Sequence, residues 1–270
     1  MKRLVKAVVP KKWRPEERVE GALPGSIPGK ARFAYDGRSV LDCSIAYNKY
    51  GGYCVPTSSS HRPAAKAVLS GAVYEPKTLE YMIEHCGPRD VVHAGTFFGD
   101  FLPALSGALE PGALLWAFEP NHESFRCARI TIELNGLRNV RLTNAGIGAR
   151  RQQLYVETVD AKGRALGGAS RIVEDTSGAR AAQPVDIVAI DDVVPGDRDV
   201  GIMQLDLEGY EEQALMGAVA TIRRCLPILI VEVMPRSTLE QSPWFSDSIL
   251  GLGYERLTTL HENSVYVPRA

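Results

Sequence analysis

The chain has 270 residues, of which 45% are hydrophobic and 23% charged, an ordinary composition for one large globular domain. Its 31 basic and 32 acidic residues nearly cancel, so no overall field attracts a nucleic acid or an anionic membrane. The longest apolar runs, such as residues 228–233, are far shorter than the roughly 20 residues that a membrane-spanning helix needs. We therefore expect a small-molecule or saccharide partner, with no nucleic acid and no membrane.

The cysteines also bear on the compartment. There are five, widely scattered and without the spacing of a metal site: Cys43, Cys54, Cys86, Cys127 and Cys225. This usage is typical of buried thiols in a reducing environment. The basic start of the chain has only a short apolar run, interrupted by Lys6, and so does not resemble a secretion signal. We expect a cytoplasmic protein.

The first third of the chain is predicted to precede the main fold. Residues 1–30 combine many charges with prolines and glycines and have no apolar period, which is typical of a loose arm. A strand is predicted over residues 38–47 and a loop over 50–63. The serines before His61 should cap a helix with Pro63 in its first turn, and a second helix should cover residues 75–86. We assign residues 31–88 to a cap or substrate-binding segment.

Beyond Asp90, short apolar strands alternate with amphipathic helices. We predict strands at residues 91–94, 114–118, 140–144, 202–205 and 228–232, helices at 100–109, 123–135 and 210–224, and two closing strands at 254–257 and 264–267. This alternation predicts βαβ crossovers and an α/β fold with a parallel sheet covered on both faces. Residues 89–270 would form this domain, with its ligand at the carboxyl ends of the strands.

The first two strand ends have the residues of a nucleoside site. His93 to Asp100 includes the turn G-x-x-x-G, whose glycines let backbone N–H groups approach a polar ligand, although a tight turn without a ligand has the same pattern. The next strand ends at Glu119 and Pro120, and a carboxylate there can accept hydrogen bonds from two ribose hydroxyls. Together the two ends favour a bound nucleoside.

The remaining strand ends are also polar. Asn144 to Gly146 would suit the edge of an adenine, or an ordinary turn. Asp206, Glu208 and Glu211 gather where the fourth strand opens into a helix, and Glu211 fits an ordinary charge at a helix N-terminus. The fifth strand again ends in an acid, Glu232. Polar residues at successive strand ends predict a single cleft.

These motifs resemble a known family. The runs VVHAGTFFGDF, AFEPNHESFRCARITIELNGLRNVRLTNAGIG and IMQLDLEGYEEQALMGAVATIRRCLPILIVEV are similar to the FkbM family of S-adenosylmethionine-dependent methyltransferases, over about residues 74–235. The resemblance implies a Rossmann-like class I fold with seven mostly parallel strands, and O-methylation of a hydroxyl on a sugar, polysaccharide or natural product. Three positions depart from the family pattern, which usually has Asp at His93, Asn at Phe97 and Lys at Gln204.

By position, the resemblance also implies a binding site for S-adenosyl-L-methionine. The residues expected to contact the cofactor are Glu75 and Thr78 at its amino or carboxylate end, His93, Gly95, Thr96, Phe97, Gly99 and Asp100 at its methionine part, Glu119 and Pro120 at the ribose, Asn144, Ala145 and Gly146 at the adenine, and Asp206 at the sulfonium.

Methyl transfer to a hydroxyl needs alignment and a proton acceptor. Asp206 and Glu208 are our candidates for that acceptor, with His61 as a third, although the stretch around His61 is equally an ordinary helix start.

No metal is required for this reaction, and a cation held by Asp206, Glu208 and Glu211 is the less favoured alternative. An NAD-dependent oxidoreductase would need G-x-G-x-x-G, which is missing, and a non-catalytic cofactor-binding protein is the other rival. The sequence leaves open whether the protein forms a homodimer.

Overall fold

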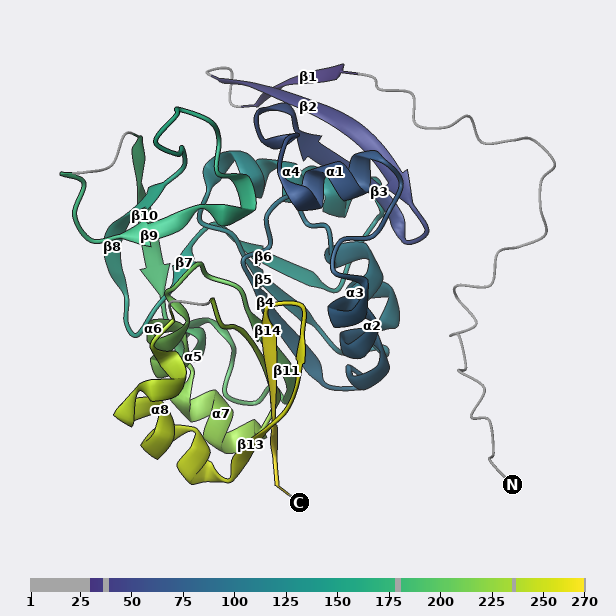
Figure 1. Cartoon of the computed structure of the whole chain (residues 1–270). Coiled ribbons are helices and arrows are strands. Elements are labelled where there is room, and N and C mark those ends of the chain that lie inside the picture. The colour runs from purple at the N-terminus through teal and green to yellow at the C-terminus, as the bar shows by residue number, and fades with distance from the viewer. Residues whose placement is uncertain (1–29, 36–38, 178–180, 235–236, 270) are drawn as a thin grey trace.

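A seven-stranded sheet forms the centre of the molecule in the computed structural model, which describes residues 30–35, 39–177, 181–234 and 237–269 (Figure 1). Its strands lie in the order β13-β14-β12-β11-β4-β5-β6. Five neighbours, from β12 to β6, run parallel, while β14 is antiparallel to both β12 and β13. The strands are β4 (Asp90–Ala94), β5 (Leu115–Phe118), β6 (Val140–Thr143), β11 (Val200–Leu205), β12 (Ile228–Glu232), β13 (Tyr254–Leu260) and β14 (Asn263–Pro268).

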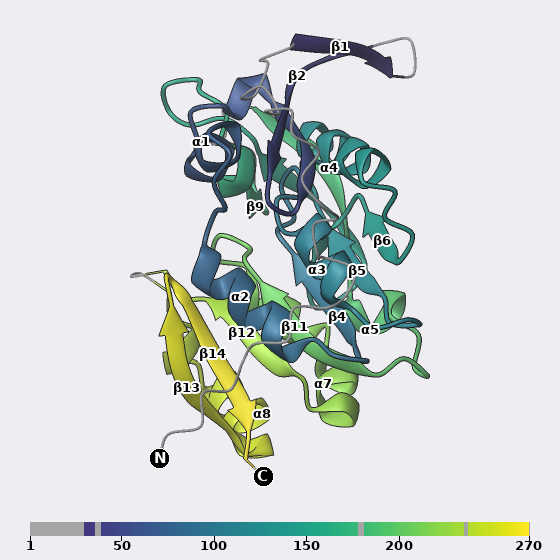
Figure 2. The same cartoon turned by 90° about the vertical axis from the view of Figure 1, so that its right-hand side faces the viewer.

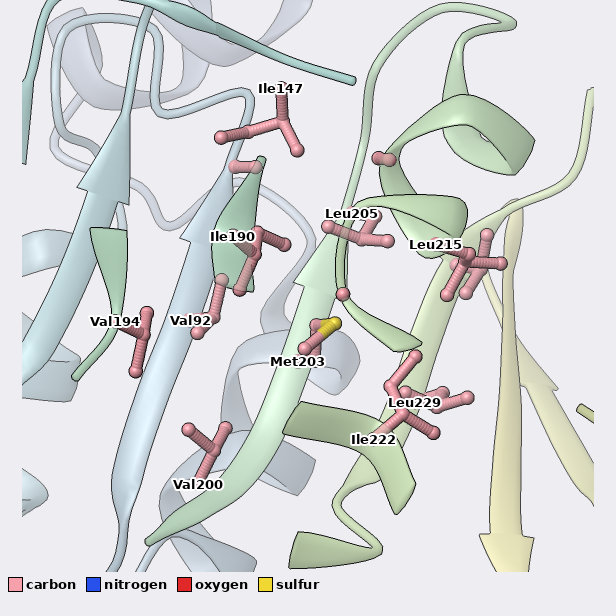
Figure 3. Packing of buried hydrophobic residues seen from close by; sticks show 14 of the residues in the cluster. Val92, Ile147, Ile190, Val194, Val200, Met203, Leu205, Leu215, Ile222 and Leu229 are labelled. Carbon is pink, nitrogen blue, oxygen red and sulfur yellow. The ribbon is translucent and has the colours of Figure 1, made fainter. Parts of the chain in front are cut away.

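Helices cover both faces of this sheet, because apolar side chains alternate along its strands. Val92 and Met203 belong to one core, which packs on α5 (Ile190–Val193), α6 (Glu211–Met216), α7 (Val219–Cys225) and α8 (Pro243–Ser248) (Figure 3). Val91 and Ile202 belong to the other, which packs on α2 (Pro76–His85), α3 (Leu102–Ala108) and α4 (His122–Leu134). The predicted α/β class I fold is confirmed. Strand order reverses between β4 and β11, so a ligand site is expected at the carboxyl ends of these two strands.

Two smaller sheets accompany the large one. The first, in the order β1-β2-β3, consists of β1 (Lys30–Tyr35), β2 (Ser39–Asn48) and β3 (Gly51–Pro56), and with α1 (Pro63–Leu69) it lies at one end of the molecule in both views (Figure 2). The second, in the order β7-β10-β8-β9, consists of β7 (Gly146–Ile147), β8 (Gln152–Glu157), β9 (Arg171–Val173) and β10 (Ala182–Val188). It is inserted between β6 and β11 in the chain.

Several predicted elements need correction. The loop expected at residues 50–63 contains the strand β3. In β3, Gly52 N donates to Asn135 Oδ1 at 2.9 Å and Cys54 N donates to Thr131 Oγ1 at 3.1 Å. The cap of α1 is Arg62 with no side-chain hydrogen bond, because Ser58 instead donates to Glu123. The helix expected at 210–224 is two helices, α6 and α7.

Two other expectations concern the N-terminal arm and membrane-spanning helices. The arm predicted for residues 1–30 falls outside the described residues, except for Lys30, where β1 begins. Within the part of the chain that is described, no helix combines the length and the apolar character needed to cross a membrane.

Candidate functional site

The turn after β4 brings the ends of two central strands into contact. Asp206 N donates to Ala94 O at 3.1 Å, and Gly95 has φ 87°, a left-handed conformation that favours glycine. A Cβ at Gly95 would lie 1.9 Å from the carbonyl oxygen of Asp206. Only glycine therefore allows this approach, which places the first and fourth predicted strand ends side by side.

Glu119 is held at the same edge by two backbone donors. It follows β5, is only 4% exposed, and accepts hydrogen bonds from Phe97 N at 2.7 Å and from Asn121 N at 2.8 Å. Burial raises the pKa of Glu119 to about 8, against the opposing effect of the two N–H donors. A carboxylate has about four acceptor positions, so two remain for a ligand.

One small cavity joins these residues. It is lined by Gly95, Glu119, Pro120, Gly146, Ile147, Asp206, Leu207 and Tyr210, with Gly168, Ser170 and Ile172 of the inserted segment as its roof. Five of the predicted cofactor contacts thus share one cavity: Gly95, Glu119, Pro120, Gly146 and Asp206. Its volume is about 20 Å³, enough for about one water molecule, whereas small-molecule sites measure roughly 300 to 1,000 Å³. The cavity in this structure is therefore too small for a nucleoside.

A second group of predicted contacts lies toward α2 and the C-terminal hairpin. Glu75 accepts a hydrogen bond from Asn263 Nδ2 at 2.8 Å, and Thr78 Oγ1 lies 3.1 Å from His261 Nδ1. Burial, and to a smaller extent the charge of Glu75, raise the pKa of Asp100 to about 7. The pKa of Glu75 is also raised by burial. A cationic ligand would stabilise the ionised forms of these acids, so the neighbourhood of Asp206 suits a cation.

Three carboxylates converge at the ends of β11 and β12. One oxygen from each of Asp206, Glu208 and Glu232 lies within 4.8 Å of the others. Burial, and then the charges of Glu232 and Glu208, raise the pKa of Asp206 well above its usual range. Burial and the charge of Glu208 raise the pKa of Glu232 to about 7. Glu232 is predicted from the sequence only as a strand-end acid without a role, although two adjacent parallel strands that both end in an acid would have indicated this cluster.

Other predicted residues lie outside the small cavity. His61 lines a neighbouring cavity of about 500 Å³, together with residues that include Ser58, Thr158 and Arg164. A hydrogen bond of 2.9 Å between Asn121 Nδ2 and Ser170 Oγ joins one lining residue of each cavity. The structure thus brings Asp206 and Glu208 together and places His61 in an adjoining space.

Three further predicted contacts have structural partners. Asn144 Nδ2 donates to the carbonyl oxygens of Glu119 and Pro120, and Ala145 is buried in the apolar core below the sheet edge. Thr96 is fully buried, and its Oγ1 donates to the carbonyl oxygen of His93 at 3.2 Å. These contacts stabilise the turns that carry the cavity lining.

Comparison with known proteins identifies the family. The family model described as the methyltransferase FkbM domain matches residues 86–256, most of the chain. This chain belongs to the FkbM methyltransferase family. The S-adenosylmethionine-dependent family predicted from the sequence is confirmed. A search of curated proteins found no match.

Solved structures similar to this FkbM methyltransferase are distant in sequence. Methyltransferase FkbM from Methylobacillus flagellatus KT is 19% identical with a TM-score of 0.44, over 67% of this chain and 43% of that one, so the chain spans less than half of that protein. A SAM-dependent methyltransferase from Aquifex aeolicus is 14% identical with a TM-score of 0.41, over 72% and 88%. The 16S rRNA N2 G1207 methyltransferase of T. Thermophilus, in complex with AdoMet and guanosine, is 13% identical with a TM-score of 0.46, over 86% and 51%.

Two departures from the FkbM pattern contact each other. His93 on β4 is paired in register with Gln204 on β11, and His93 Nδ1 lies 2.5 Å from Gln204 Oε1. The ring of His93 stacks on Phe101, and burial lowers the pKa of His93 to about 4, so the imidazole is neutral at pH 7. The positions where the family usually has Asp and Lys therefore hold a neutral hydrogen-bonded pair. His93 is not among the residues that line the cavity of Gly95, Glu119 and Asp206.

The buried acids predict a pH-dependent stability for the unliganded enzyme. A carboxyl group whose pKa is higher in the folded state binds more protons when folded, so the free energy of unfolding falls as pH rises between its two pKa values. For Glu119 this window runs from about 4.5 to about 8. We expect urea denaturation to show falling stability over this range and Glu119→Gln to flatten the slope. An unchanged slope in the variant would contradict the raised pKa of Glu119.

Proposed function

We propose that this FkbM methyltransferase transfers the methyl group of S-adenosylmethionine to a hydroxyl of a sugar, polysaccharide or natural product. The observation that carries the proposal is the convergence of Gly95, Glu119 and Asp206 on one cavity at the carboxyl ends of three parallel strands. When bound, S-adenosylmethionine supplies a methyl group on a sulfonium that loses its positive charge as the methyl leaves. A cation beside Asp206 would stabilise the ionised form of this buried carboxyl group.

The residues present fit this cofactor in chemical type. Glu119 keeps two acceptor positions for the ribose hydroxyls, and Gly146 and Ile147 offer a small, apolar surface for the adenine. Glu75 and Asp100 would face the ammonium end, with Thr78, Thr96, Phe97 and Gly99 alongside. His93 would act indirectly, by keeping β4 and β11 in register through Gln204.

The chain's own acids can take the proton of the acceptor. The acceptor oxygen gains the methyl group and loses its hydrogen, while the electron pair of the broken carbon–sulfur bond stays on sulfur. Asp206 or Glu208 receives this proton, which is typically worth ~10²- to 10⁴-fold in rate. His61, in the adjoining cavity, is the third candidate and would act on an acceptor that lies there.

The adjoining cavity also supports a role for the cap in acceptor binding. Ser58 and His61 come from residues 31–88, whereas Thr158 and Arg164 come from the inserted segment, so the cavity of about 500 Å³ lies between the two. Its hydroxyl, imidazole and guanidinium groups can hydrogen-bond a polyhydroxylated molecule. We assign the cap and this cavity to a small-molecule or saccharide acceptor.

Calorimetry separates this proposal from its rivals. We expect S-adenosylhomocysteine to bind and NAD not to bind, and Glu119→Ala to weaken S-adenosylhomocysteine by at least about tenfold, because one charge-assisted hydrogen bond is worth roughly 1.5 to 3 kcal/mol. The control is Glu123→Ala, which changes a neighbouring acid that is absent from the small cavity. Binding of NAD in place of S-adenosylhomocysteine would reject the proposal. Release of S-adenosylhomocysteine during incubation with hydroxylated acceptors then tests catalysis, and binding without turnover across saccharides and polyketides would favour a non-catalytic protein.

A further inference from the structure

The three converging carboxylates can do more than accept a proton. We propose that Asp206, Glu208 and Glu232 form a binding site for one hard divalent cation, such as Mg²⁺ or Mn²⁺, which holds the oxygen of the acceptor. One oxygen from each lies within 4.8 Å of the others, a spacing that a single ion can bridge. The cation site follows from these residues alone, whereas its role toward the acceptor rests on the proposed methyl transfer.

The backbone presents these carboxylates together. Leu205 and Val231 are paired in register on the parallel strands β11 and β12, so the residues that follow them, Asp206 and Glu232, are neighbours at the edge of the sheet. Glu208 has φ 54°, a conformation that is uncommon for a residue with a side chain, on the turn that leads from β11 toward α6. The site is thus formed by two strand ends and one tight turn, which are stiffer supports than a long loop.

Glu211 is excluded from the cluster by its own hydrogen bonds. Its Oε1 accepts from the backbone N–H groups of Leu207 and Gly209, each at 3.0 Å. Glu211 therefore holds the turn that carries Glu208. The cation group considered from the sequence, with Glu211 as its third member, is replaced by one with Glu232.

Glu232 provides the independent sign of a ligand. Glu232 is only 9% exposed, and its Oε2 is buried without a hydrogen-bond partner among the described residues. A buried carboxylate oxygen that lacks a donor costs free energy, and a buried charge costs more. A cation at the cluster would supply a partner for Oε2 and would displace the proton that Asp206 and Glu232 share when one of them is neutral.

Basic side chains lie near the cluster but do not pair with it. Among the residues described, none of the three carboxylates forms an ion pair with Lys or Arg within 4.0 Å. The charges of Arg62 and Arg171 act on Glu208, and Arg171 is itself paired with Glu157 at 2.6 Å. Three mutually repelling acids in a half-buried place are stabilised most by a multivalent cation.

The donor set identifies the class of cation and of acceptor. Three carboxylate oxygens are hard ligands that suit Mg²⁺, Mn²⁺ or Ca²⁺, and they leave at least three of the usual six or more positions free. Those positions can take water or one or two oxygens of the acceptor, which favours a substrate with neighbouring hydroxyl groups. A carboxylate that coordinates through one oxygen keeps its other oxygen, so Asp206 can still receive the acceptor proton.

Electron paramagnetic resonance with Mn²⁺ tests the site directly. Full-length protein, freed of metal with a chelator, is titrated with Mn²⁺ in the presence and absence of S-adenosylhomocysteine, and the signal of free Mn²⁺ is followed. We expect one Mn²⁺ per chain, displaced by excess Mg²⁺, and at least about tenfold weaker binding in Glu232→Gln and Glu208→Gln, since even the loss of a second-shell partner costs roughly 10- to 100-fold. Circular dichroism and thermal melting show whether each variant is folded.

The matched control is Glu262→Gln. Glu262 is an exposed acid whose charge acts on Glu208 and Glu232, but it is not part of the cluster. Its removal should change Mn²⁺ affinity by less than about twofold at physiological salt, where exposed charges are screened. Equal weakening in Glu262→Gln and in the two folded cluster variants would overturn the proposal, because binding would then follow the general negative field.

Calorimetry with S-adenosylhomocysteine on the same samples separates this proposal from the proposed function. If the protein binds S-adenosylhomocysteine but no Mn²⁺ under either condition, the cation site is rejected and methyl transfer stands. If it binds Mn²⁺ at the three acids but no S-adenosylhomocysteine, the cation site stands and the proposed function is rejected.

Discussion

Replacing Asp206 with asparagine should lower kcat by about 10²- to 10⁴-fold, the usual contribution of a positioned proton acceptor. Asparagine has nearly the same shape, but its amide cannot take a proton from a hydroxyl. Asp206 N donates to Ala94 O through the backbone, so this link between β11 and β4 is independent of the side chain. The variant should therefore stay folded. The measurement is the initial rate of S-adenosylhomocysteine release with an acceptor that the native enzyme methylates.

Two comparisons make the Asp206→Asn result interpretable. Glu262→Gln removes one exposed negative charge from the same region and should leave kcat within about twofold, because exposed charges are screened by salt. S-adenosylhomocysteine should still bind Asp206→Asn, at most about 100-fold more weakly than the native protein, since one charge-assisted hydrogen bond is worth roughly 1.5 to 3 kcal/mol. A kcat within about fivefold of the native value would assign the proton to another group.

Gly95→Ala should be the most destabilising change at the site. The new methyl group would lie 1.9 Å from the carbonyl oxygen of Asp206, a backbone atom of a residue whose N–H donates to Ala94 O. The left-handed φ of 87° adds roughly 1 to 2 kcal/mol for any residue with a Cβ. We expect a total loss above about 4 kcal/mol in the free energy of unfolding, together with loss of S-adenosylhomocysteine binding.

Gly112→Ala, measured by urea denaturation, separates the cost of the steric clash from the cost of the left-handed backbone conformation. Gly112 has φ 97°, close to that of Gly95, but a Cβ there meets nothing within 4 Å. This control should lose only the roughly 1 to 2 kcal/mol of backbone strain. Equal losses in Gly95→Ala and Gly112→Ala would show that the ends of β4 and β11 do not approach as closely as the structure has them.

The central sheet could be predicted because its strands are short apolar runs separated by amphipathic helices. The predicted strands at 91–94 and 228–232 correspond to β4 (Asp90–Ala94) and β12 (Ile228–Glu232). The topology then explains why residues far apart in the chain line one cavity, since Gly95, Glu119 and Asp206 each follow a parallel strand. A rule about strand ends was therefore enough to bring them together.

The elements that were missed depend on contacts between distant segments. β3 lies in a stretch dense in turn formers, and its backbone donors are satisfied by Thr131 and Asn135 of a helix far along the chain. The break between α6 and α7 lies at Gly217, where a Cβ would be 2.0 Å from the carbonyl oxygen of Gly148. Local propensity contains no information about such approaches.

The departures at His93 and Gln204 also depend on a contact between distant segments that the sequence does not reveal. Read separately, His93 removes an acid and Gln204 removes a base from the FkbM pattern. In the structure they face each other across β4 and β11 as a neutral hydrogen-bonded pair, so the Asp and Lys of the expected pattern would face each other here as opposite charges. Replacing a buried ion pair by a well-packed neutral pair is often close to neutral for stability. Only the strand register reveals that the two changes belong together.

The roof formed by Gly168, Ser170 and Ile172 has a kinetic consequence. If the cavity is as narrow when the ligand arrives, a nucleoside enters only after the segment with Gly168, Ser170 and Ile172 has moved aside. At high cofactor concentration the association rate would then reach a plateau set by the roof. Because Ser170 is hydrogen-bonded to Asn121, which also lines the cavity beside His61, each opening would loosen the partition between the two spaces. Capture of the methyl donor and admission of the acceptor would thus share one gate.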